Sequence, residues 1–372
     1  MRIPLSAPDI TEAEIEAVTA VLRSLRLSLG PKLEEFERVM AEYAGVSHAV
    51  AVNSGTSGLH LCIQALDIGE GDEVIVPSFT FIAAANSIRY ERARPVFVDI
   101  DPVTLNLDPE KMEAAITPRT RAIMVVHTFG VPAEMDAILA IAQRHNLYVI
   151  EDSCEAIGAE YKDRRTGSFG HAAVFAFYPN KQVTTGEGGM IVTRDAQLAA
   201  RMRALRNQGR YDASAWLQHA EVGYNYRISE MNCALGIGQM KRIKEILDKR
   251  EAAAAAYGDA FAGVEGIVLP PLRLPDIRVS WFVYVIRLAD CYTAEHRNAL
   301  MSFLESEGIG CAPYFAPIHL QHSYPEWRSA HLPVTEGVAA RTLALPFFNN
   351  LSQSQIKEVA SALREGLRIL QK

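Results

Sequence analysis

A lysine between an apolar strand and a glycine-rich turn is the residue best placed to do chemistry in this chain. The run 172–178, AAVFAFY, has the length and the valine and aromatic content of a buried strand, and a proline ends it. Lys181 follows, and the glycines at 186–189 permit a turn that approaches a ligand closely. A lysine kept partly out of water is nucleophilic toward an aldehyde, whereas the ordinary alternative is a solvated lysine on a hairpin.

A second group of residues is suited to holding a phosphate. Ser54, Gly55, Thr56 and Ser57 join an expected strand, 49–52, to a helix. Main-chain N–H groups at a helix N-terminus, with hydroxyls beside them, bind phosphate. The alternative is that Ser54 or Thr56 only caps the helix. The run matches neither a Walker loop nor a dinucleotide fingerprint.

Asp152 and Phe81 also follow expected strands. Ligands of open α/β sheets bind at the carboxyl ends of the strands, so the Asp152 carboxylate is expected to face a pocket. It could pair with the ring nitrogen of a pyridine cofactor and keep the ring protonated, as pyridoxal phosphate (PLP) chemistry requires. The alternative is a helix cap. Phe81 could stack on an aromatic cofactor or be an ordinary core residue.

The elements that carry these residues alternate between strand and helix. Up to about residue 150, continuous apolar runs that indicate buried strands alternate with expected helices. This alternation predicts an α/β fold with one doubly wound, mostly parallel sheet and helices on both faces. Four requirements of one cofactor therefore fall at strand ends: a phosphate cradle, an aromatic face, an acid and a lysine. The expected strands are 49–52, 73–76, 95–100, 122–127 and 147–150.

The C-terminal part lacks this rhythm. Ser229 begins an expected long helix that reaches about Ala262 and bridges to a second unit. Strands and helices then follow without βα alternation, which predicts a smaller α+β domain. The predicted domains are 1–245 and 246–372. The expected elements of the second domain include strands 266–269, 280–288 and 309–314 and helices 293–308 and 352–370.

Composition excludes several classes of protein. The 372 residues are 49% hydrophobic and 22% charged, with a formal net charge of −7 and no basic run, so nucleic acid is not an expected partner. No apolar stretch reaches the ~20 residues of a membrane span, and the N-terminus does not resemble a signal peptide. Five scattered cysteines without metal spacing predict a cytoplasmic protein with no metal site.

These motifs, in this order, resemble the DegT/DnrJ/EryC1/StrS sugar aminotransferase family, which belongs to the aspartate-aminotransferase-type (fold type I) PLP enzymes. The resemblance covers nearly the whole chain. It rests on the runs LSLGPKLEEFE, AVNSGTSGLHL, GDEVIVPSFTFIAAANSI, PVFVDID, EDSCEAIGA, FYPNKQVTTGEGGM, GYNYRISEMNCALG and YFAPIHLQ.

The resemblance implies a role for each residue singled out above. Lys181 is expected to bind the PLP aldehyde as an imine and then to move a proton between the substrate carbon and C4′ of the cofactor. Asp152 is expected to pair with the pyridine nitrogen, residues 55–57 to hold the phosphate, and Phe81 to stack on the ring.

Further residues gain roles only through the resemblance. Asn225, in GYNYR, resembles a residue that crosses a dimer interface to the partner's phosphate, which implies a homodimer with shared active sites. Tyr314 and His319, in YFAPIH, resemble residues that close over the sugar substrate.

Three positions depart from the family pattern. Ala176 stands where a phosphate-binding serine is frequent, and Arg26 where a tryptophan is common near the substrate mouth. Glu155 stands where Gln or His is frequent, near the phenolic oxygen of the cofactor. An ionised carboxylate beside a phenolate is unfavourable, so we predict that Glu155 is protonated, with a raised pKa.

The implied reaction moves an amino group from L-glutamate to a keto carbon of a nucleotide-linked deoxy sugar, for polysaccharide or glycoside biosynthesis. GYNYR and Glu155 favour C4 of a 4-keto-6-deoxyhexose, as in perosamine-type enzymes. The alternatives are a 3-keto sugar, a cyclitol, a PLP dehydratase on the same scaffold, or a non-enzymatic regulator. Dehydratase relatives typically replace the lysine with histidine, and a regulator could lose Lys181 or Asp152, so the presence of both residues disfavours these two.

Overall fold

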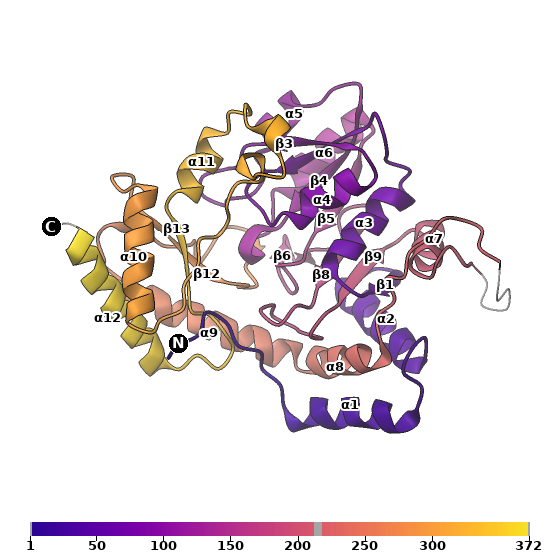
Figure 1. Cartoon of the computed structure of the whole chain (residues 1–372), viewed down its shortest axis with the longest axis horizontal. Helices are drawn as coiled ribbons and strands as arrows, with labels where there is room; N and C mark the ends of the chain where they lie inside the picture. Colours follow the sequence, from indigo (N-terminus) through magenta and orange to yellow (C-terminus); the bar gives the residue numbers. More distant parts are fainter. Residues whose placement is uncertain (1, 212–217, 371–372) are drawn as a thin grey trace.

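A seven-stranded sheet carries the loops in which the predicted site residues lie. The computed structural model describes residues 2–211 and 218–370 (Figure 1). The strand order is β1-β9-β8-β5-β4-β2-β3. The strands are β1 His48–Val52, β9 Gly189–Thr193, β8 Ala172–Ala176, β5 Tyr148–Asp152, β4 Thr120–Val126, β2 Glu73–Pro77 and β3 Arg94–Val98.

This sheet is mostly parallel, as predicted. Strand β9 pairs antiparallel with both β1 and β8, whereas the pairs β8–β5, β5–β4, β4–β2 and β2–β3 are parallel. Strand β9 runs the opposite way because the turn containing Lys181 returns the chain directly beside β8. The carboxyl ends of β1, β2, β4, β5 and β8 therefore share one edge of the sheet.

Helices cover both faces of the sheet, which confirms the predicted layers. Alternate residues of each strand pack on opposite sides: Val50 and Val174 join α3, α4 and α7, whereas Ala51 and Phe175 join α2 and α8. Helix α6 covers the second face farther along the sheet. These helices are α2 Pro31–Ala44, α3 Gly55–Ala65, α4 Ala83–Tyr90, α6 Met135–His145, α7 Ala196–Arg206 and α8 Glu230–Lys241.

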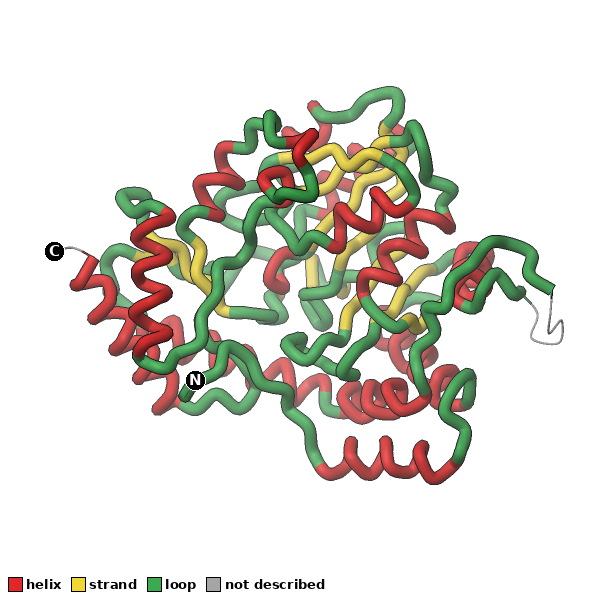
Figure 2. The backbone as a smooth tube through the Cα atoms, viewed as in Figure 1, coloured by secondary structure: helices red, strands yellow, loops and turns green. Residues whose placement is uncertain are grey.

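A second hydrophobic core lies beside the large sheet. Its three-stranded sheet, in the order β10-β12-β13, packs with α9, α10 and α12, and Figure 2 shows these strands next to the helices that end the chain. This is the predicted smaller α+β unit. Its elements are α9 Ile243–Ala260, β10 Ile267–Val268, β12 Tyr284–Leu288, α10 Ala294–Ser306, β13 Thr342–Leu345 and α12 Gln353–Leu370.

Two predicted elements are wrong. The single helix expected from Ser229 is two helices, α8 and α9, because the chain leaves helical geometry at Arg242, whose guanidinium pairs with Asp9 and Glu14. The expected strand 309–314 contains Pro313, which cannot donate to a ladder, and only isolated bridges form there. The third strand of the small sheet is β13 instead.

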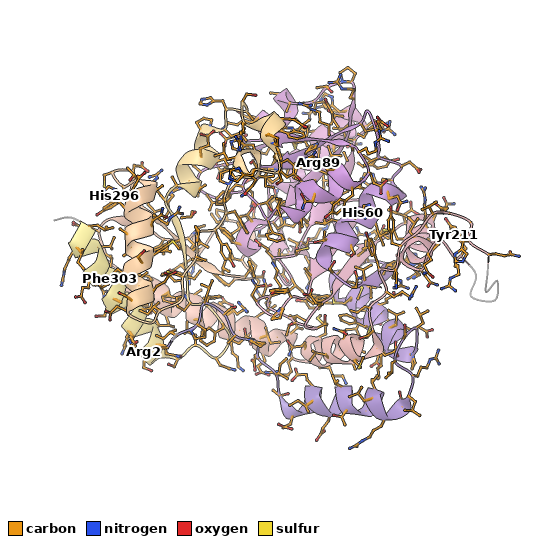
Figure 3. The ribbon with its side chains drawn as sticks, in the orientation of Figure 1. Arg2, His60, Arg89, Tyr211, His296 and Phe303 are labelled. Carbon is orange, nitrogen blue, oxygen red and sulfur yellow. The ribbon has the colours of Figure 1, made fainter. Side chains whose placement is uncertain are left out.

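Segments from each part of the chain contribute to the other part's core. Ile3 packs in the core of the small unit, and Arg2 lies beside α12, where it pairs with Glu358 (Figure 3). Conversely, Ile318 and Trp327 pack in the core of the large sheet. The division at residue 245 stays a prediction.

The remaining elements are short or peripheral. Helix α1, at the lower edge of Figure 1, begins with the predicted capping box between Thr11 and Glu14. None of the helices in the described ranges combines the length and apolar character needed to cross a bilayer. These elements are α1 Glu12–Ser24, α5 Pro109–Ala114, β6 Glu160–Tyr161, β7 Arg164–Arg165, β11 Ile277–Arg278 and α11 Pro333–Ala339.

Candidate active site

A cavity of about 280 Å³ opens where the carboxyl ends of the parallel strands of the large sheet meet. Loops after β1, β2, β5 and β8 line it, together with residues of the small unit, so the topology brings distant parts of the sequence together. Most of the predicted site residues lie in this lining: Gly55, Thr56, Phe81, Asp152, Glu155, Lys181 and Tyr314.

The N-terminus of α3 forms one end of the cavity. The Ser54 hydroxyl caps the helix by accepting the N–H of Ser57 at 3.1 Å, and the Ser57 hydroxyl donates to Asn53 at 2.7 Å. Within the described residues, no hydrogen bond engages the main-chain N–H of Gly55 or Thr56. Two free donors at the positive end of a helix dipole fit a phosphate group, whereas the Ser57 hydroxyl is occupied within the turn.

Gly55 is required by close packing at this end. A Cβ at this position would lie 2.8 Å from Cβ of Ala176 and 3.0 Å from Sγ of Cys154. Only glycine therefore lets the helix N-terminus approach β8 and the loop after β5. The alanine that departs from the family pattern lies directly against the expected phosphate site.

Asp152 ends β5 and is buried. Its Oδ1 accepts the N–H of Cys154 at 3.1 Å. Burial raises the pKa of this carboxyl, against the effects of the Cys154 N–H and Lys181. A buried carboxyl that lines the cavity and has further acceptor capacity fits a protonated ring nitrogen, because that partner would favour the charged form.

A buried pair supports the strands from which Asp152 projects. His127, at the end of β4, lies with Nε2 3.0 Å from Oε2 of Glu151, and its Nδ1 accepts the N–H of Ala133 at 3.1 Å. The acceptor role of Nδ1 assigns the proton to Nε2. Glu151 also accepts the N–H groups of Gly167, Phe169 and Gly170. This network holds the ends of β4 and β5 in place.

Lys181 extends into the cavity between a carboxyl and an aromatic ring. Its Nζ lies 3.6 Å from Oε1 of Glu155 and 3.8 Å from the centre of the Phe282 ring, and its side chain is only 14% exposed. The alternative of an ordinary solvated lysine is therefore wrong. Burial raises the pKa of Glu155, in the predicted direction. Phe282 is a lining residue that the sequence analysis did not identify.

Two aromatic residues reach the cavity from opposite sides. Phe81 is 60% exposed, so it is not an ordinary core residue. Tyr314 arrives from the small unit and interacts with the side chain of Asn180, which also lines the cavity. Phe315 continues the apolar wall beside it.

Ser57, His319 and Asn225 lie outside this lining, and the phosphate contact of Ser57 stays a prediction. The His319 ring is fully buried, with Nδ1 2.7 Å from the Ser78 hydroxyl and Nε2 3.4 Å from Glu336. Asn225 is exposed on the loop before α8. Tyr226, on the same loop, anchors it by contacting His60 of α3 at 3.0 Å, and Figure 3 marks His60 on that helix. The sugar contact of His319 and the cross-subunit role of Asn225 stay predictions.

The donor set as a whole fits PLP. Two free N–H groups are available for a phosphate, a buried carboxyl is available for a ring nitrogen, and a largely buried lysine amine is available for an aldehyde. Among the residues described by the structure, no cluster of His, Cys, Asp and Glu could hold a metal ion.

Comparisons with known proteins agree with this chemistry. Residues 8–364 match the DegT/DnrJ/EryC1/StrS aminotransferase family. The chain is 42% identical over 368 residues to the GDP-perosamine synthase of Caulobacter vibrioides, covering 98% of each chain. It is 40% identical to the spore coat polysaccharide biosynthesis protein SpsC of Bacillus subtilis, covering 98% of this chain and 96% of SpsC.

A solved structure supports the fold assignment. DesV from S. venezuelae, crystallised with a ketimine intermediate, superimposes with a TM-score of 0.90 at 38% identity over 98% of each chain. The chain therefore belongs to the DegT/DnrJ/EryC1/StrS family and is a PLP-dependent sugar aminotransferase of fold type I.

Proposed function

We propose that this aminotransferase takes an amino group from L-glutamate and places it on C4 of a nucleotide-linked 4-keto-6-deoxy sugar, for polysaccharide or glycoside biosynthesis. The proposal depends above all on one observation, the full-length similarity to a GDP-perosamine synthase. The position of Glu155 in the cavity lining supports the same assignment, since this residue is one of the two perosamine-type features of the sequence.

The chemistry is divided between the cofactor and the residues that hold it. When bound, PLP supplies an aldehyde that takes up the amino group and a ring that accepts electrons. The Lys181 amine would hold the aldehyde, and its Nζ would then carry the proton that leaves the substrate carbon. The Asp152 carboxylate would pair with the ring nitrogen and favour its protonated form, and the Phe81 ring would lie against the cofactor ring.

Other residues bind the phosphate and exclude water. The N–H groups of Gly55 and Thr56, with the Thr56 hydroxyl, would bind the phosphate at the positive end of α3. Phe282 and Phe315 form an apolar wall that strengthens the electrostatic interactions inside the cavity. Tyr314 contributes a hydroxyl beside the position expected for the sugar.

We further propose a homodimer with shared active sites, in the cytoplasm. Asn225 is exposed and absent from its own cavity lining, which suits a residue that reaches a partner subunit. Large apolar side chains that are exposed in a single chain support burial against a second copy, with Leu25 87% exposed. Five free cysteines support a reducing compartment. The exposed apolar residues near α1 are Ile10, Ile15, Leu22, Leu25, Leu27 and Leu29.

The absorbance spectrum of the PLP-loaded protein, before and after adding L-glutamate, tests the first half-reaction. We expect a yellow band that L-glutamate converts to the pyridoxamine band, and we expect no yellow band in Lys181→Ala. A yellow band that glutamate leaves unchanged would exclude this donor. Absence of a yellow band in the wild-type protein would contradict the role of Lys181.

The second half-reaction needs a panel of nucleotide-linked keto sugars, with products identified by mass spectrometry. We expect a 4-amino-4,6-dideoxy sugar. A 3-amino sugar or an aminated cyclitol would move the assignment to those substrates. A deoxygenated product that retains no nitrogen would indicate a dehydratase, and no transfer from any donor would favour a regulator.

A further inference from the structure

A buried arginine lies behind the proposed catalytic lysine. Arg250, on α9, is only 2% exposed. Burial lowers the pKa of its guanidinium to about 10, and Asp9 opposes this effect. The Asp9 carboxylate is itself paired with Arg242 and Lys249, each at 3.1 Å. Arg250 therefore lacks a carboxylate partner of its own among the residues that the structure describes.

The Arg250 guanidinium is bonded to main-chain carbonyls instead. Nη1 donates to the carbonyls of Trp281 at 3.1 Å and Phe282 at 3.0 Å, and Nη2 donates to the carbonyl of Lys181 at 3.4 Å. Its Nε has no hydrogen-bond partner in the described structure. One planar group thus ties together two segments that are distant in the sequence.

These two segments carry the two sides of one contact in the cavity. The Phe282 ring lies 3.8 Å from Nζ of Lys181, and Arg250 holds the main chain of both residues. Gln182 secures the next position, because its Nε2 donates to the carbonyl of Glu155 at 2.7 Å and to the Ser280 hydroxyl at 3.1 Å. The start of the lysine side chain and the ring beneath its amine are therefore fixed relative to each other.

Burial of this arginine carries a desolvation cost. A buried cation without a carboxylate partner is costly to desolvate, and well-packed apolar residues frequently replace buried charges without loss of stability. Phe347, whose ring centre lies 5.4 Å from the guanidinium carbon, shows that the surroundings include apolar groups. The guanidinium joins the main chain at Lys181 to the main chain at Trp281 and Phe282, so its contribution is to hold these two segments together.

We propose that Arg250 is a positioning residue, which holds Lys181 and Phe282 so that the lysine amine meets the cofactor aldehyde. This inference rests on the proposed role of Lys181 and adds a residue that acts through it. Because a small displacement of a reacting group lowers its effective concentration strongly, loss of Arg250 should weaken formation of the bond between lysine and cofactor. Contacts to the phosphate and the ring do not involve Arg250 and should persist.

The test compares two forms of the cofactor on the full chain. PLP has the aldehyde that reacts with Lys181, whereas pyridoxamine phosphate carries an amine there and binds only through its phosphate and ring. Affinities of both are measured for wild type, Arg250→Met, Arg250→Lys and Arg297→Met, with melting temperatures of the cofactor-free proteins. Arg297 is the matched control, since it donates to the carbonyls of Ala339 and Thr342 in the small unit, outside the cavity lining.

We expect Arg250→Met to lower the affinity for PLP on the order of tenfold or more. The affinity for pyridoxamine phosphate should change by less than about twofold. Arg250→Lys should recover part of the loss, because an ammonium cannot span all three carbonyls as the guanidinium does. Arg297→Met should leave both affinities unchanged. If Arg250→Met does not fold, Arg250→Lys provides the same comparison with a smaller expected difference.

Equal losses for the two cofactor forms would show a merely structural role and overturn the proposal, as would unchanged affinity for both. Lys181→Ala separates this failure from failure of the proposed function. If that variant keeps the yellow band and wild-type PLP affinity, the role of Lys181 itself is wrong. If it loses them while Arg250→Met weakens both forms equally, only the role of Arg250 is wrong.

Discussion

Nζ of Lys181 lies 3.6 Å from Oε1 of Glu155, and the other oxygen of that carboxyl accepts the N–H of Phe129 at 2.9 Å. Burial raises the pKa of Glu155, and Asp152 adds to this effect, whereas Lys181 and the Phe129 N–H oppose it. The raised pKa favours the neutral form of the carboxyl, which can both donate and accept a hydrogen bond.

We therefore predict that the Glu155→Gln variant keeps its aminotransferase activity. An amide reproduces the shape and the hydrogen-bonding capacity of a protonated carboxyl, so kcat should fall by less than about threefold. Glu155→Ala is the contrasting variant, because it leaves the buried Phe129 N–H without its acceptor, at a cost of about 1–3 kcal/mol in unfolding free energy. Steady-state kinetics and urea unfolding measure the two effects. A large loss of kcat in Glu155→Gln would show that the carboxylate charge is needed.

The same residue predicts a pH dependence of stability. Because the pKa in the folded protein lies above the ordinary value of 4.5, Glu155 contributes stability below that value and loses it as the pH rises through the raised pKa. The unfolding free energy of the cofactor-free wild type should therefore fall relative to that of Glu155→Gln as the pH increases from 4.5. Urea unfolding at several pH values measures this difference. Parallel curves for the two proteins would contradict the raised pKa.

We predict that the substitution Ala176→Ser increases the affinity for the cofactor. Cβ of Ala176 lies against Gly55 at the N-terminus of α3, so Ala176→Ser places a hydroxyl beside the proposed phosphate site. One hydrogen bond to a charged group stabilises by about 1.5–3 kcal/mol, which corresponds to roughly tenfold or more in affinity. Pyridoxamine phosphate affinity measures this gain without interference from the lysine reaction. Unchanged affinity would place the phosphate beyond reach of residue 176.

We predict that replacing Glu230, which lies away from the cavity, strongly lowers the stability of the fold. The buried carboxylate of this residue accepts the N–H groups of Gly30, Lys32 and Leu33 at the start of α2, at 2.8 to 3.0 Å. Glu230→Ala removes a charged cap from three donors and should lower the unfolding free energy by about 3 kcal/mol. Glu230→Gln should lose less, because it keeps one acceptor oxygen.

Urea unfolding of the cofactor-free protein is the measurement for both Glu230 variants. Glu251→Ala is the control, because Glu251 is an exposed residue of α9. Similar unfolding midpoints for Glu230→Ala and Glu251→Ala would show that the cap does not stabilise the fold.

Local signals were sufficient to predict much of the fold. The capping box at Thr11 and the proline at residue 31 mark helix starts that the structure confirms, and the apolar runs correspond to strands of the large sheet. Residues at strand ends could be placed in one cavity, because the carboxyl ends of parallel strands meet at one edge. Asp152 and Lys181 are the clearest examples.

Residues whose role depends on distant packing could not be predicted in this way. Arg250 stands in the run DKREAAAAAYG, which is typical of an exposed helix surface, and it is buried only because α9 packs on the chain at Trp281 and Phe282. Phe282 follows a tryptophan in an apolar run and carries no local sign that its ring meets Lys181. Arg242, at the break between α8 and α9, likewise pairs with acids of the N-terminal segment, which no local pattern indicates.

The exchange of segments between the two cores limits how the active site can open. Ile3 is held in the small core, and Ile318 and Trp327 are held in the large one, where His319 also bonds Ser78 at 2.7 Å. A hinge motion that swung the small domain away as one body would have to detach these buried contacts. Opening of the cavity by rigid-body separation of the two units is therefore disfavoured, because the core of each unit contains a segment from the other part of the chain.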